Sequence, residues 1–232
     1  MNKFYKENDD NFYLNAILNY RLDQNDEKIN LSVMADGFFK ASLILIRECI
    51  EKDTLNDKDV VIFPMIFCLN HGIELYEKSI IYYLNDILDN KDTYKRGHDI
   101  YNLWEDIKKL RNKLDIEELS ALGFEENEEY FLEKTKVLED YLKETTTLNT
   151  STCLVKNKKK LYLKEITSFD FPRYSKNSRG ENQFYLKNKN NMFIDLENAL
   201  TIIENIYSCL KDLSFYYADI LEALNERYTE GF

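Results

Sequence analysis

Residues that interrupt regular structure are scarce in this sequence, with only 6 glycines and 2 prolines among 232 residues. Proteins built from many short strands and turns need more of both, so the composition excludes a mainly β architecture. Hydrophobic residues make up 44% of the chain, which is enough apolar material for a packed core and excludes general disorder. The sequence therefore favours a few long helices with few connections.

A long uninterrupted apolar run is also missing. The longest, Val60 to Leu69, contains Pro64 and falls short of the ~20 residues that a bilayer-spanning helix needs. Acidic residues occupy the N-terminal stretch where a signal peptide would be apolar. The net charge of -11 opposes general attraction to nucleic acid or to an anionic membrane. We expect a cytoplasmic protein that does not bind membranes.

Cysteine and histidine are too few, or wrongly spaced, for the common zinc-binding and catalytic motifs. The four cysteines include no CxxC pair, and three of them lie among apolar residues, so buried free thiols are favoured over disulfides or zinc ligands. We expect no metal and no cofactor. Phosphate-binding glycine loops, the GxSxG motif and the HExxH motif are all missing from the sequence.

Apolar residues recur at helical spacing in several long segments, and Ser32 is the expected N-cap of the first. We predict an all-α fold, an up-down bundle of about five helices with a small β-hairpin insertion before the last helix. Residues 1–30 would form an N-terminal arm and residues 31–232 the helical domain. The predicted helices span about 32–52, 59–89, 98–118, 126–148 and 192–228.

The insertion, residues 153–190, differs in charge from the rest of the chain. It holds ten basic residues and three acidic ones, interleaved with aromatic side chains. Such a ribbon can bind a nucleic-acid backbone and stack bases, or dock on an acidic surface of its own chain or of a partner. The residues predicted to bind are Lys158, Lys159, Lys160, Arg173, Tyr174 and Arg179.

The two histidines are the first candidates for catalysis. His71 shares a helix face with Glu74, which favours either acid–base chemistry or a structural hydrogen-bond network. His98 opens the third predicted helix, where capping or packing is the alternative to catalysis. Arg96 or Arg111 would then stabilise a phosphate.

Three segments of the sequence resemble a known family. HGIELYEKSI in the second predicted helix, GHDIYNLW at the start of the third and the later FDFPRYSKNSRGENQF resemble HEPN-type helical bundles of prokaryotic defence and toxin systems. The resemblance covers roughly residues 32–225. It implies a dimeric bundle, and in active members a metal-independent ribonuclease with an RNxxxH motif.

The chain departs from that motif at one position. Arg111 and Asn112 fit its start, but Ile116 stands where the histidine belongs. The departure favours a module of a defence or toxin–antitoxin assembly that binds a protein partner or nucleic acid without catalysis. A ribonuclease toxin with an altered His/Arg site is the alternative. A homodimer, or a hetero-oligomer with a defence-system partner, is expected, with RNA as a possible ligand.

Overall fold

The computed structural model is mostly helical. It describes residue 5 and residues 8–51, 55–90, 97–125, 127–157, 160–167, 169, 171–177, 180–187 and 191–230. The helices are α1 (Glu27–Glu51), α2 (Leu55–Ile87), α3 (Ile100–Arg111), α4 (Ile116–Ala121), α5 (Glu128–Asn149), α6 (Phe184–Lys187) and α7 (Leu196–Glu230). A 3-10 turn, η1 (Phe12–Leu14), precedes them. The predicted all-α class is confirmed.

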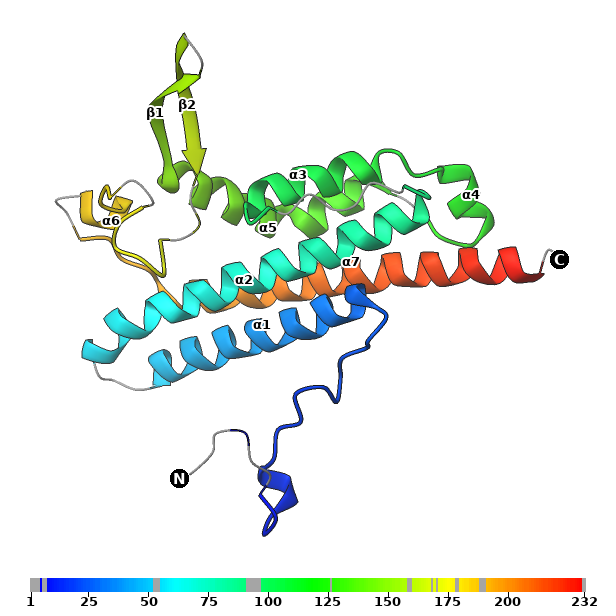
Figure 1. The fold of residues 1–232 in the computed structure, drawn as a ribbon, viewed down its shortest axis with the longest axis horizontal. Coiled ribbons are helices and arrows are strands. Elements are labelled where there is room, and N and C mark those ends of the chain that lie inside the picture. Colours follow the sequence, from blue (N-terminus) through cyan, green and yellow to red (C-terminus); the bar gives the residue numbers. More distant parts are fainter. Residues whose placement is uncertain are drawn as a thin grey trace.

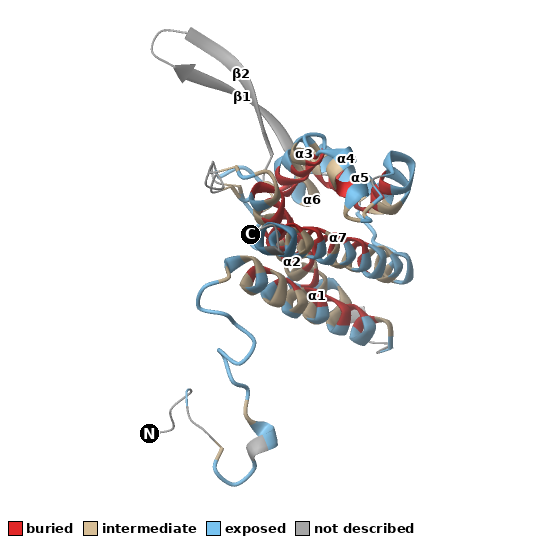
Figure 2. Ribbon diagram, turned by 90° about the vertical axis from the view of Figure 1, so that its right-hand side faces the viewer, coloured by how far each residue is buried: buried red, intermediate tan, exposed pale blue. Residues whose placement is uncertain are grey.

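The long helices form three layers, with α2 and α7 in the middle (Figure 1). Helix α1 packs against one side of this pair, and α3 and α5 cover the other, as the end-on view shows (Figure 2). Helix α2 therefore has neighbours on most sides, which explains why its sequence is apolar almost all round.

Aspartate or asparagine caps decide where several helices begin, because their side chains accept hydrogen bonds from the first free backbone N–H groups. The prediction of Ser32 as the first cap is wrong: α1 starts five residues earlier, and Asp26 accepts from the amides of Lys28 and Ile29. Asp115 caps α4, so the predicted helix 98–118 is two helices. Asp99, Asn127 and Asp195 make equivalent contacts at α3, α5 and α7.

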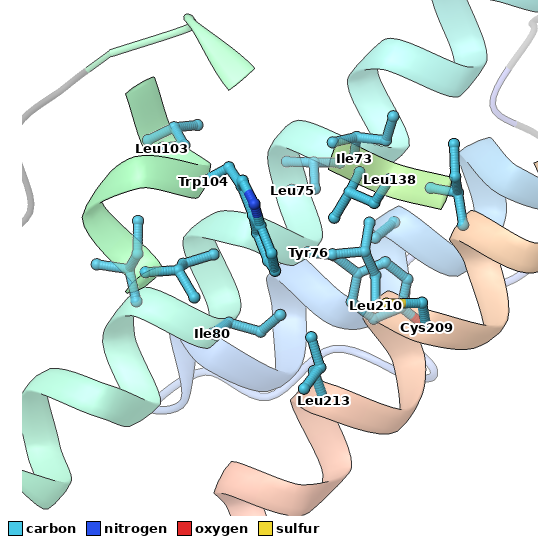
Figure 3. Close-up of a cluster of buried hydrophobic side chains, with 14 of the residues drawn as sticks. Ile73, Leu75, Tyr76, Ile80, Leu103, Trp104, Leu138, Cys209, Leu210 and Leu213 are labelled. Carbon is cyan, nitrogen blue, oxygen red and sulfur yellow. The ribbon is translucent and has the colours of Figure 1, made fainter. Parts of the chain in front are cut away.

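The core is formed by α1, α2, α3, α5 and α7 together. Trp104 of α3 is almost fully buried and extends towards Ile80 of α2 and Leu213 of α7 (Figure 3). Its indole ring stacks on Phe131 of α5, with centroids 5.9 Å apart, and its Nε1 donates to Glu139 at 3.2 Å. The predicted buried free thiols are confirmed for Cys49 and Cys209, while the free thiol of Cys68 is half-buried.

Between α5 and α6 the chain forms strands β1 (Thr150–Asn157) and β2 (Lys160–Thr167). They pair antiparallel, with Thr150 opposite Thr167. The segment that follows packs back on α2, because Tyr185 lies 5.4 Å from Phe63, measured between ring centroids. The basic stretch is thereby joined to the N-terminal half of α2.

Two helical segments, 27–51 and 57–87, are long and apolar enough to cross a membrane by length and composition alone. In the structure, 33% and 44% of their most apolar windows are buried against other parts of the chain. The core helices of globular proteins meet the same criteria. The expected cytoplasmic location remains a prediction.

Candidate acid–base site

Glu74 is the centre of a polar cluster on an otherwise apolar part of α2. Its Oε1 lies 2.8 Å from Nδ1 of His98 and 2.5 Å from Nζ of Lys78. Its Oε2 lies 3.6 Å from Nδ1 of His71. One carboxylate therefore faces two imidazoles and one ammonium group.

Helical spacing accounts for three of the four residues in this cluster. His71, Glu74 and Lys78 are three and four residues apart, so they share one face of α2. His98 comes from elsewhere: it precedes Asp99, the N-cap of α3, and reaches Glu74 because α3 packs across α2.

The carboxyl of Glu74 is held ionised. Burial by itself raises its pKa, but hydrogen bonds from His71, Lys78 and His98 outweigh burial and lower the pKa to about 2. The neighbouring Glu77 has the opposite environment. It is fully buried, and neither of its oxygens has a hydrogen-bond partner in the part of the chain that the structure describes. Burial, followed by repulsion from Glu74 and Asp99, raises its pKa well above the usual range. Burial therefore favours the neutral form of Glu77, whereas the partners of Glu74 favour its ionised form.

The two imidazoles differ in exposure. The side chain of His98 is 82% exposed, that of His71 is 31% exposed, and that of Glu74 only 10%. Both histidines turn Nδ1 towards Glu74, and among the described residues neither Nε2 has a hydrogen-bond partner. This arrangement leaves Nε2 of each ring available to a ligand.

Aromatic side chains surround His71. Its ring makes an edge contact with Phe38 of α1 and stacks on Phe67 of α2, at centroid distances of 4.4 and 5.7 Å. The guanidinium of Arg173 lies 5.5 Å from the same Phe67 ring and 5.4 Å from Tyr174. An arginine of the basic insertion thus contacts the same aromatic ring on which His71 stacks.

Arg111 does not belong to the cluster. It is the last residue of α3, and His98 precedes the first; at 1.5 Å per residue the helix separates them by ~20 Å. The Arg111 guanidinium is buried, pairs with Glu128 and lies 4.0 Å from the ring of Phe131. Its position in the structure indicates a packing role.

The other predicted residues are placed only in part. Arg96, Lys158, Lys159 and Arg179 lie outside the described residues. Lys160 is the first residue of β2, and Arg173 and Tyr174 are exposed in the segment after that strand. Among the residues that the structure describes, no group of three His, Cys, Asp or Glu side chains is suited to hold a metal ion.

Sequence reasoning missed Glu77 and the aromatic surroundings of His71. A signal for Glu77 was present, because Ile73, Glu77, Ile80 and Leu84 follow helical spacing and all four are buried. For Phe38 no local signal existed, because its contact with His71 depends on how α1 packs against α2.

Comparison with protein families, with curated proteins and with solved structures finds no match for this chain. The resemblance to HEPN bundles therefore stays a prediction from the quoted segments.

Proposed function

We propose that the His71–Glu74–His98 cluster is an acid–base site, and that the chain is a HEPN-like, metal-independent ribonuclease with an altered His/Arg arrangement. The observation that carries this proposal is that one ionised carboxylate faces Nδ1 of both imidazoles, while Nε2 of each ring has no hydrogen-bond partner among the described residues. A carboxylate in that position fixes the tautomer and the orientation of an imidazole.

Two imidazoles suit cleavage of an RNA phosphodiester. One ring in its neutral form removes the proton from the ribose 2′-hydroxyl as that oxygen attacks phosphorus. The other, protonated, gives its proton to the departing 5′-oxygen. The products are a 2′,3′-cyclic phosphate and a 5′-hydroxyl, so the reaction consumes no cofactor. Lys78 and Arg173 supply positive charge near the developing negative phosphate.

The basic insertion, residues 153–190, is the proposed contact with the RNA backbone. Its Arg173 lies over the ring of Phe67, which stacks on His71, and also over the ring of Tyr174. A strand following this surface would pass the histidines. We also propose a defence or toxin–antitoxin assembly as the setting, and this part is supported only by the family resemblance.

The test uses purified protein, structured and single-stranded RNA, and a chelator to remove divalent ions. Wild type should cleave the RNA and leave cyclic phosphate ends, whereas His98→Ala and His71→Ala should lose at least ~100-fold in rate. Lys109→Ala is the matched control, because Lys109 is an exposed residue of α3 that pairs with Asp106 and lies outside the histidine cluster. Circular dichroism checks that each variant folds. Equal cleavage by wild type and both histidine variants would contradict the proposal.

A binding module without catalysis is the second candidate. The packing of His71 between Phe38 and Phe67 favours it, because a ring fixed by two aromatic contacts also serves a structural purpose. In this case RNA or a protein partner would be retained in a gel-shift or pull-down assay, RNA would stay intact, and Arg173→Ala would weaken binding.

A further inference from the structure

Residues 8–25, the continuously described part of the N-terminal arm before the cap of α1, carry an unusual amount of exposed apolar surface. Isolated apolar side chains are common on protein surfaces, but several within one short segment mark an interaction site. The exposed fractions are 95% for Tyr13, 71% for Leu14, 50% for Ile17, 77% for Leu18 and 77% for Tyr20. The arm runs away from the helical bundle and does not fold back over it (Figure 1).

The tip of the arm is held in shape by its own hydrogen bonds. The amide of Asn8 donates to the Asn15 side chain at 2.7 Å, and Asn15 Nδ2 donates back to the Asn8 carbonyl at 3.2 Å. Asp23 and Asn30 exchange a second such pair, which joins the arm to the first turns of α1. Because the tip is preorganised, its binding to a partner costs less ordering entropy.

A matching apolar surface lies on α1. Met34, Gly37, Ala41 and Ile44 are three or four residues apart and form one stripe, which we call the α1 stripe. Met34 is 45% exposed and Ile44 is 66% exposed. A Cβ atom added at Gly37 would meet nothing within 4 Å, so the stripe has open space at its centre.

We propose that the arm of one chain docks on the α1 stripe of a second copy, and that the second copy returns the same contact. Both the arm and the α1 stripe are exposed on this chain. In a two-fold symmetric dimer, each arm would cover the stripe of the other chain, so both surfaces would be buried. The arm tip carries exposed Asp9 and Asp10. Lys40, beside the stripe, is 59% exposed, and its Nζ lies 3.8 Å from Oδ2 of Asp36, so the two carboxylates of the arm would share Lys40 with Asp36. From Leu18 to Glu27 the chain spans up to ~30 Å when extended, which is enough to reach a neighbouring molecule.

The experiment compares full-length wild type with two variants by light scattering after gel filtration. The protein concentration runs from about 1 to about 100 µM, a range that spans the dissociation constants of weak dimers. The arm variant is Tyr13→Ser/Leu14→Ser/Leu18→Ser. The stripe variant is Gly37→Glu/Ile44→Glu. Every substituted position is exposed, so both variants should keep the wild-type circular dichroism. Wild type should be dimeric, and each variant should associate at least ~10-fold more weakly.

Mixing the variants separates arm exchange from other modes of association. An arm variant still has an intact stripe, and a stripe variant still has an intact arm, so a mixed pair keeps one of the two contacts. A tagged arm variant should capture the stripe variant, whereas neither should capture itself. The matched control is Glu129→Ser on α5, at an exposed position away from α1, which should associate like wild type.

Each of three self-association results would overturn the proposal: a monomeric wild type at all concentrations, a wild-type dimer that the arm variant preserves, or no capture in the mixed sample. Co-sedimentation of wild type with phosphatidylcholine vesicles, lost in the arm variant, would assign the arm to a membrane surface and would also overturn it. None of these outcomes depends on ribonuclease activity, so this inference and the proposed function fail separately.

Discussion

Nδ1 of His98 lies 2.8 Å from Oε1 of Glu74, although the two residues are 24 positions apart, Glu74 within α2 and His98 just before α3. This contact joins the start of α3 to the middle of α2. It also gives Glu74 a partner on the exposed side of the cluster, since His98 is far more exposed than the carboxylate that it meets. The carboxylate of Glu74 therefore contributes both to the stability of the fold and to the chemistry of the proposed site.

Glu74→Gln should lower the free energy of unfolding by ~2 kcal/mol at pH 7, because the ion pairs and hydrogen bonds that keep the carboxylate ionised are lost. The pKa of Glu74 is depressed in the folded state, from 4.5 to about 2. Its contribution is therefore present above about 4.5 and disappears as the pH falls towards 2. Urea unfolding from pH 7 to pH 2.5 should show wild type and variant converging. A constant difference would contradict the assignment.

Glu77→Met should stabilise the protein by ~1–3 kcal/mol at pH 7, because an apolar side chain of similar size replaces a buried carboxyl that has no hydrogen bond to any described residue. The contribution of Glu77 to the free energy of unfolding changes with pH in the opposite direction to that of Glu74. The folded pKa is raised, so the unfolded chain releases a proton above its ordinary pKa while the folded chain retains it. The gain measured by thermal unfolding should grow from pH 4 to pH 8. A destabilised variant at pH 8 would refute this view of Glu77.

Two glycines in helices should respond oppositely to alanine. Gly37→Ala should stabilise the chain by ~0.5–1 kcal/mol, because alanine favours the helix and the added Cβ meets open space. Gly72→Ala should destabilise it by ~1–3 kcal/mol, because the new Cβ would lie 2.8 Å from Cδ2 of the fully buried Phe39. Thermal melts of the two variants beside wild type provide the measurement. Stabilisation by Gly72→Ala would show that Phe39 can move aside.

Arg111→Ala should destabilise the fold by ~2–4 kcal/mol and leave the rate of RNA cleavage per folded molecule unchanged. The guanidinium packs on Phe131 and pairs with Glu128, remote from the histidines. Glu128→Gln is the milder comparison, because it removes one charge while Arg111 keeps its aromatic contact. If Arg111→Ala loses activity but still gives the wild-type circular dichroism spectrum, Arg111 takes part in the proposed site.

The sequence by itself determined that the chain is helical and roughly where its long helices run, because apolar spacing and scarce glycine and proline are local properties. It also determined that His71, Glu74 and Lys78 share a face, since that follows from helical geometry alone. Helix starts were predicted less well: Asp26 and Asp115 act as caps, and a cap depends on backbone geometry that residue type indicates only in part.

Only the tertiary structure decided which side chains from different helices meet. The packing of α3 on α2 brings His98 to Glu74, and the packing of α5 beside α3 gives Arg111 a partner in Glu128 instead of a place near the histidines. Such contacts depend on how helices cross, which is set by the sum of many buried side chains. A short motif does not specify how helices cross. The meeting of His98 with the residues of α2 is therefore decided by the tertiary structure.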